Sequence, residues 1–451
     1  MNHKKNSRYT FSTNIFYFII LLLVSSCGGA PGLKRVLKKQ TPYEKYQQRL
    51  QDSGLDETAL GREWITSGQK ALQDSLYITL PFSESGYFKA ERPTASGYRF
   101  QARRGEVLVI NVDVKTQQDT QLFIDLFEVE KITQKTNYLA SGDTTNYYLE
   151  YEVVEDHDYL IRLQPELLRG GQYTITVITR PALAWPVYGE IKAIGSFFGA
   201  DRDGGKRRHE GLDIFAAKGT PAIAAVEGRV TGVKENRLGG KVVWVTDMER
   251  RQSLYYAHLD TQMVRVGQKV FPGDTLGLVG NTGNARTTPP HLHFGIYRSG
   301  RGAVDPAPYV FQSSHKPLDI KVDAEQLGSW MRTTPKSSNL RMSPDTKSEI
   351  LKLLPRHTPV MLTGGIDSWF RVFLPDGSSG YISSSLVETA DKPIRQENPK
   401  DRKFVWDTPG PEAIPLADLN ENEEIPVLAQ FNDFLYVKSP EGILGWIPLI
   451  Y

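Results

Sequence analysis

The chain has 451 residues, of which 39% are hydrophobic and 24% charged, and its formal net charge at pH 7 is +2. This composition is that of an ordinary soluble globular protein, and the length predicts two to four domains. The nearly balanced charge argues against nucleic acid as the main partner. A local basic cluster is interpreted first as a solvated loop and alternatively as a contact to an anionic polymer; it consists of Arg202, Lys206, Arg207 and Arg208.

The N-terminus has the pattern of a bacterial lipoprotein signal. Basic residues precede an apolar run from Ile15 to Val24, which at about ten residues is too short to span a bilayer as a helix. The run ends in Ser25-Ser26-Cys27-Gly28, which matches the lipoprotein cleavage pattern. We therefore expect residues 1–26 to be removed and Cys27, the single cysteine, to carry a lipid anchor; an accidental cysteine after an uncleaved anchor is the alternative. With no acidic residue after Cys27, the expected location is the outer membrane, facing the periplasm.

The sequence pattern of residues 27–181 predicts a tether, a helical segment and a β-sandwich. Residues 27–42 are polar, and residues 43–74 read as helical, with a break at Gly54 and a restart capped by Asp56 or Thr58. Short alternating strands with Gly-rich turns over residues 75–181 predict a jelly-roll-like sandwich, similar to pre-peptidase modules of secreted proteases. We expect it to bind or to act as a spacer; covering a neighbouring active site is the alternative.

Four of the eight histidines fall between residues 209 and 293, together with one aspartate. They form His209-x-x-x-Asp213, an isolated His258, and His291-Leu292-His293. In an extended strand His291 and His293 project to the same face, while the glycine within the first motif favours a loop that runs into a strand. Catalytic zinc takes three such ligands and leaves one position for water, so a hydrolytic zinc site is indicated. Either motif alone is weak, because isolated matches are commonly accidental.

The motifs around these histidines resemble the lysostaphin-type (LytM-like) zinc peptidases, which cut peptidoglycan peptides. The resemblance covers residues 186–312 in order: Gly195-Ser196-Phe197-Phe198-Gly199, Arg208-His209-Glu210-Gly211-Leu212-Asp213-Ile214, Gly219-Thr220-Pro221, Tyr256-Ala257-His258-Leu259, Gly280-Asn281-Thr282-Gly283, Pro290-His291-Leu292-His293-Phe294 and Val304-Asp305-Pro306. An ordered series of this kind is highly specific.

This resemblance implies roles for all five side chains. It implies that His209, Asp213 and His293 bind one Zn²⁺ and that His258 and His291 are the catalytic pair of a zinc metalloendopeptidase. A histidine suits the proton transfer, because a neutral imidazole has a pKa of about 6.5 and no His-Glu-x-x-His motif is present. The implied partner is peptidoglycan, with no small-molecule cofactor beyond zinc. A catalytically silent scaffold or an activator of other wall hydrolases is the alternative, although such relatives typically lose ligands.

Two departures from the family pattern concern substrate fit rather than the metal. The family usually has a run of small residues before Pro-His-Leu-His, where this chain has Arg286-Thr287-Thr288-Pro289-Pro290. Gly295 stands where a Glu often follows the Phe.

Short alternating runs separated by Gly, Pro, Asp and Asn predict an antiparallel sheet for this domain. A lipoyl carrier is a non-enzymatic alternative, but Lys269 leads into apolar Val270-Phe271 instead of an exposed hairpin tip.

The C-terminal part contains an internal repeat. Val372 to Ile382 aligns with Val437 to Ile447 at a shift of 65 residues, which predicts two copies of one small unit. The first, residues 328–390, is similar to bacterial SH3-type domains, which often accompany wall hydrolases as wall-binding modules. Residues 391–403 read as a linker and residues 404–451 as a second SH3-like barrel. The aromatics of the two units either stack on a ligand or form the cores: Trp369, Tyr381, Phe434 and Trp446. The whole chain is thus expected to be mainly β and multidomain.

Overall fold

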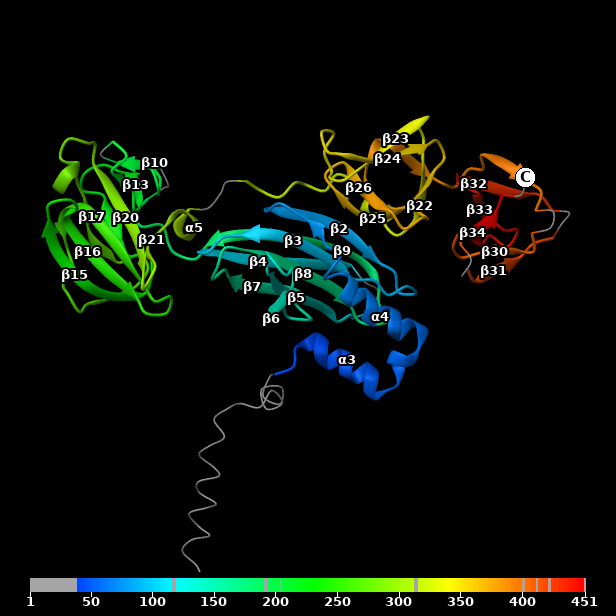
Figure 1. Ribbon diagram of the computed structural model, residues 1–451, viewed down its shortest axis with the longest axis horizontal. Helices are drawn as coiled ribbons and strands as arrows, with labels where there is room; N and C mark the ends of the chain where they lie inside the picture. The colour runs from blue at the N-terminus through cyan, green and yellow to red at the C-terminus, as the bar shows by residue number, and fades with distance from the viewer. Residues whose placement is uncertain are drawn as a thin grey trace, which may run out of the picture. The chain divides into compact units, whose positions relative to one another are not determined.

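The computed structural model describes residues 39–115, 119–189, 194–202, 204–311, 315–399, 402–410, 413–420 and 423–449 (Figure 1). The predicted signal peptide, Cys27 and most of the tether lie outside the described residues. By its contacts the chain divides into residues 1–49 and residues 50–451. Within the described ranges, every helix is too short or too polar to cross a membrane.

The helical segment forms two helices, as predicted. They are α3 (Pro42–Asp52) and α4 (Ala59–Lys70), with the 3-10 helix η1 (Leu55–Glu57) between them. The break lies at Gly54, whose φ of 68° suits a residue without a Cβ. Thr58 is the N-cap of α4, because its side chain accepts a hydrogen bond from the Gly61 N–H at 3.1 Å. Trp64 of α4 is buried and donates its indole N–H to the Pro165 carbonyl at 2.8 Å, which fixes α4 to the sandwich.

Two sheets face each other in the sandwich. One sheet has the order β1-β3-β8-β5-β6: Leu76–Tyr77, Ser96–Ala102, His157–Pro165, Leu122–Val129 and Thr136–Ser141. The facing strands have the order β2-β9-β4-β7: Phe82–Phe88, Gly171–Pro181, Glu106–Lys115 and Tyr148–Glu152. Alternate apolar side chains of both sheets form one buried core that includes Tyr98, Ile161, Ile110 and Ile175. The core is therefore a β-sandwich core, as the alternating pattern predicts.

The first SH3-like unit continues the second sheet of the sandwich. Its strands are β22 (Trp330–Thr333), β23 (Ser337–Arg341), β24 (Ile350–Pro355), β25 (Pro359–Ile366), β26 (Trp369–Phe373), β27 (Ser379–Ser383) and β28 (Val387–Thr389), with the 3-10 helices η3 (Ala324–Gln326) and η4 (Ser384–Leu386). Strand β25 pairs with β2 in antiparallel register, with Gly86 opposite Gly364. The two predicted modules therefore share one sheet.

A buried polar cluster lies at this junction. The Arg371 guanidinium donates to both carboxylate oxygens of Glu84, at 2.8 and 3.2 Å, and the Glu84 side chain is fully buried. Tyr98 also donates its hydroxyl to Glu84, at 2.9 Å. A Cβ at Gly364 would lie 2.7 Å from the same carboxylate, so the absence of a side chain there lets the strands approach.

The C-terminal unit, for which a second SH3-like barrel stays a prediction, has its own six-stranded sheet, in the order β29-β32-β33-β34-β30-β31. The strands are Arg395–Glu397, Ile425–Phe431, Phe434–Lys438, Leu444–Pro448, Phe404–Trp406 and Pro415–Asp418. Strand β29 lies inside the predicted linker and pairs with β32, so this stretch is partly sheet and not only a spacer. Trp369, Tyr381 and Trp446 are buried and Phe434 packs partly buried against a core, which supports the core interpretation over ligand stacking.

The middle domain is an antiparallel sheet, as predicted, and its described residues form ten strands. Its main path is β10-β13-β20-β17-β16-β15-β18, and β14, β19 and β21 pair at its sides. The strand bounds in chain order are β10 (Ile194–Ser196), β13 (Leu212–Phe215), β14 (Pro221–Ile223), β15 (Gly228–Asn236), β16 (Gly240–Asp247), β17 (Gln252–Gln262), β18 (Lys269–Val270), β19 (Thr275–Val279), β20 (His291–Arg298) and β21 (Gly302–Val304). A separate hairpin joins β11 (Asp201–Arg202) to β12 (Arg207–Arg208), and two short helices are η2 (Gly283–Ala285) and α5 (Ala307–Val310).

Candidate metal centre

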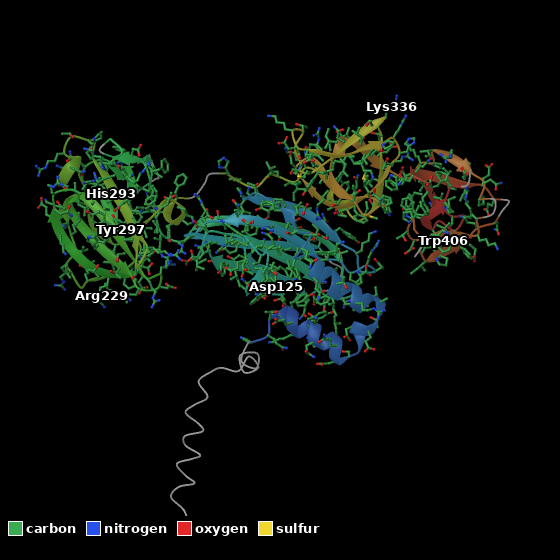
Figure 2. All side chains as sticks on the ribbon, viewed as in Figure 1. Asp125, Arg229, His293, Tyr297, Lys336 and Trp406 are labelled. Atoms are coloured by element: carbon green, nitrogen blue, oxygen red, sulfur yellow. The ribbon has the colours of Figure 1, made fainter. Side chains whose placement is uncertain are left out.

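Strands β13 and β20 bring the three candidate ligands together. They pair antiparallel with Asp213 opposite His293, and His209 lies on the loop that leads into β13. The Asp213 Oδ1 atom is 3.0 Å from His209 Nε2 and 3.0 Å from His293 Nδ1, and the two nitrogens are 3.0 Å apart. Figure 2 labels His293 on this sheet. Three residues from two chain segments thus point their ligand atoms at one position.

Neighbouring groups orient these ligands. His209 donates its Nδ1–H to the Phe197 carbonyl at 2.8 Å, which leaves the Nε2 lone pair directed at Asp213 and His293. Arg202 donates from Nη2 to Asp213 Oδ2 at 2.7 Å and leaves Oδ1 for the cluster. Two imidazole nitrogens and a carboxylate oxygen are the donor set that zinc prefers, so the side chains present fit this ion.

The charge state of the cluster suits a cation. Burial alone would raise the pKa of the Asp213 carboxyl, but hydrogen bonds and charge from His209 and His293 hold it well below its usual range. Burial lowers the pKa of His293, although Asp213 opposes this shift. At neutral pH the cluster therefore holds an ionised carboxylate and a neutral His293, the forms that coordinate metal.

His258 and His291 lie beside the cluster, and among the described residues neither Nε2 atom takes part in a hydrogen bond. Each donates its Nδ1–H to a backbone carbonyl, His258 to Thr282 at 2.9 Å and His291 to Pro289 at 2.8 Å. Their ring centroids are 4.9 Å apart, and His291 Nε2 is 4.0 Å from Asp213 Oδ1. Both imidazoles therefore present an Nε2 lone pair to accept a proton.

The environment of His258 keeps its imidazole neutral. Burial, with the adjacent His291 and His293, lowers the pKa of His258 to about 4. Its backbone has a φ of 60°, in the left-handed region that non-glycine residues rarely adopt, and its N–H donates to the Gly239 carbonyl at 2.7 Å. The backbone thus places this imidazole in a fixed position on the cavity wall.

The five side chains line one cavity of about 840 Å³. All the residues that line it belong to the range 195–297, so within the described part of the chain the sandwich contributes no wall. The sandwich instead contacts the middle domain elsewhere, where Arg250 donates to both carboxylate oxygens of Glu152, at 2.6 and 2.8 Å. A binding or spacer role for the sandwich stays a prediction.

Two features of the cavity were missed in the sequence. Arg202 is half-buried and bonded to a candidate ligand, whereas we interpreted its cluster as a solvated loop; Arg207 and Arg208 of that cluster are exposed, as expected. An aromatic wall also lines the cavity and consists of Trp244, Tyr255 and Tyr297. Tyr297 follows His293 by four residues, so strand alternation could have placed it on the same face.

Two parts of this chain match models of known protein families, and the first part is also similar to curated proteins. Residues 207–306 match the model of peptidase family M23, and residues 336–388 match that of the bacterial SH3 domain. The L-Ala–D-Glu endopeptidase of Bacillus subtilis (strain 168) is 38% identical over 117 residues, which are 24% of this chain and 36% of that protein. The murein hydrolase activator NlpD of Escherichia coli (strain K12) is 34% identical over 129 residues, which are 28% of this chain and 31% of that protein.

A solved structure gives a similar match. The catalytic domain of lysostaphin from Staphylococcus simulans is 31% identical, with a TM-score of 0.24, and the match covers 26% of this chain and 90% of that domain. The chain spans roughly a third of the length of the two curated relatives, so their similarity concerns one domain.

Proposed function

Because this chain carries a peptidase family M23 domain followed by a bacterial SH3 domain, we propose that it is a zinc-dependent endopeptidase that hydrolyses peptide crosslinks of peptidoglycan. The observation that carries the proposal is the meeting of all five candidate side chains in one cavity. In this proposal His209, Asp213 and His293 hold one Zn²⁺, and His258 and His291 transfer protons. A catalytically inactive relative does not require both the three ligands and the proton-transfer pair, and this chain has both.

The proton-transfer chemistry follows from the two Nε2 atoms. Zinc, when bound, supplies Lewis acidity toward water and toward the scissile carbonyl. One imidazole accepts the proton of the attacking water at Nε2 and passes it to the leaving nitrogen. The other takes up a proton from solvent at Nε2 before the attack and, as an imidazolium, donates a hydrogen bond to the oxygen on which negative charge develops. The backbone carbonyls of Thr282 and Pro289 accept the Nδ1–H of each ring, so each ring gains and loses its proton at Nε2.

The alternative is a catalytically silent scaffold or an activator of other wall hydrolases, and the similarity to a murein hydrolase activator favours it. The experiment incubates the full chain, solubilised in mild detergent, with intact peptidoglycan, with and without a chelator and then with added zinc. We expect new amino groups to appear without the chelator, to disappear with it and to return with zinc. If no amino groups are released under any condition, the enzyme proposal is wrong and the alternative stands.

We also propose that the protein is tethered to the membrane through a lipid on Cys27, close to its polymer substrate. The residue lies outside the described part of the chain, so the proposal is supported by the sequence pattern alone. Cys27→Ser removes the thiol that is acylated, and we expect the variant to lose labelling by a fatty-acid probe and to leave the membrane fraction. Unchanged membrane retention in the variant would argue against the anchor.

A further inference from the structure

Three aromatic side chains form a wall beside the metal cluster. Trp244 of β16, Tyr255 of β17 and Tyr297 of β20 lie on neighbouring strands, with Trp244 opposite Tyr255. The ring of Trp244 is 4.5 Å from that of Tyr255 and 5.2 Å from that of Tyr297. Tyr255 also lies 5.9 Å from the His293 ring, so the wall begins at a candidate ligand. Figure 2 labels His293 and Tyr297, which come from the same strand.

Gly295 is buried beside this wall. It lies between His293 and Tyr297 on the same face of β20 and is opposite Tyr255 on β17. A Cβ at this position would be 3.1 Å from both the Glu210 carbonyl oxygen and a ring carbon of Tyr297. A side chain at this position would need these neighbours to shift, so the glycine lets the Glu210 backbone and the Tyr297 ring lie close together. Trp244, Tyr255 and Tyr297 are each partly exposed and line the cavity.

A carboxylate from another segment stands at the same wall. Glu210 is exposed, lines the cavity, and accepts a hydrogen bond from the Tyr297 hydroxyl at 2.9 Å. Burial, together with this hydrogen bond, raises the pKa of Tyr297, so its phenol stays protonated and remains a donor. The cavity is lined by two acidic residues, and the other, Asp213, is engaged by the cluster and by Arg202. Arg207 and Arg208 also line the cavity, and Arg208 is paired with Asp201. Glu210 therefore carries the negative charge that is left for a substrate.

We propose that Glu210 and the aromatic wall form a subsite for a protonated amino group of the peptide stem. A carboxylate pairs with an ammonium group, and the faces of Trp and Tyr attract the same charge through cation–π contacts. This inference rests on the proposed endopeptidase function and narrows its substrate. The favoured crosslinks are those in which a diamino acid near the scissile bond has an amino group that the crosslink does not use. Bridges made only of glycine lack such a group.

The test compares two crosslinked muropeptides that differ only in whether that amino group is free or acetylated. The full chain in detergent is expected to cleave the free-amine substrate with a kcat/KM about tenfold higher than the acetylated one, which corresponds to about 1.4 kcal/mol. Glu210→Gln should lose that preference, because it removes the charge while keeping the shape. Glu235→Gln, an exposed residue of β15 that does not line the cavity, is the matched control and should keep the preference.

Two further measurements distinguish a failure of the proposed subsite from a failure of the proposed endopeptidase function. Zinc content of Glu210→Gln should equal that of the unmodified protein, which shows that the neighbouring ligand His209 is undisturbed. If the unmodified protein cleaves both substrates equally, or if Glu210→Gln prefers the free amine as strongly as before, the subsite is wrong while the endopeptidase function stands. If neither substrate is cleaved by any form, the proposed function itself fails.

Discussion

Replacing His293 by alanine is expected to abolish zinc binding and hydrolysis together, whereas replacing His291 should preserve the zinc and remove most turnover. The physical reason lies in where each imidazole points. His293 Nδ1 is 3.0 Å from both Asp213 Oδ1 and His209 Nε2, so its loss leaves two ligands. His291 lies beside the cluster, and its loss removes a proton-transfer group. Loss of such a group typically lowers the rate by about 10²–10⁴-fold.

The measurement for this pair is zinc content by elemental analysis together with kcat on peptidoglycan fragments. His315→Ala is the matched control, because His315 is exposed and lies outside the middle domain, and it should leave both quantities unchanged. His258→Ala is expected to behave like His291→Ala. Equal loss of zinc in the His291 and His293 variants would contradict the division into ligands and proton-transfer residues.

The second large effect is expected at the junction between the sandwich and the first SH3-like unit. Arg371→Met removes the partner of Glu84, a carboxylate whose side chain is fully buried. An uncompensated buried charge destabilises a fold by about 3–5 kcal/mol, so the free energy of unfolding should fall by that amount. Because strands β2 and β25 pair at this point, we expect the sandwich and the SH3-like unit to become unstable together. Urea unfolding followed by tryptophan fluorescence measures the change.

Two variants test the cause of this loss. In the double variant Glu84→Gln with Arg371→Met the buried charge is gone, so much of the lost stability should return. Glu227→Gln breaks the exposed pair of Glu227 with Lys269, at 2.6 Å, and should change the unfolding free energy by less than about 1 kcal/mol. A loss in Arg371→Met no larger than in this control would show that the buried pair does not hold the modules together.

Local patterns in the sequence predicted most of the single elements. Thr58 caps α4 and Gly54 breaks the helical segment, because capping and left-handed backbone depend on one residue and its near neighbours. The alternation of His291 and His293 placed them on one face of a strand for the same reason. The mainly β, multidomain architecture followed from such short-range signals, repeated along the chain. The strand inside the stretch 391–403 escaped them, since its pairing partner β32 lies about thirty residues away.

The tertiary structure alone decided which distant residues meet. The resemblance to a family divided the five side chains into ligands and proton-transfer residues, but the pairing of β13 with β20 is what sets Asp213 opposite His293. Arg202 became a partner of Asp213, and Glu210 a partner of Tyr297, through contacts that span 11 and 87 residues. The joining of β2 to β25 likewise turned two predicted modules into one sheet. Periodicity in the sequence shows which face of a strand a residue occupies. Its neighbours across the sheet depend on long-range strand pairing and on the need of a buried charge for a partner of opposite charge.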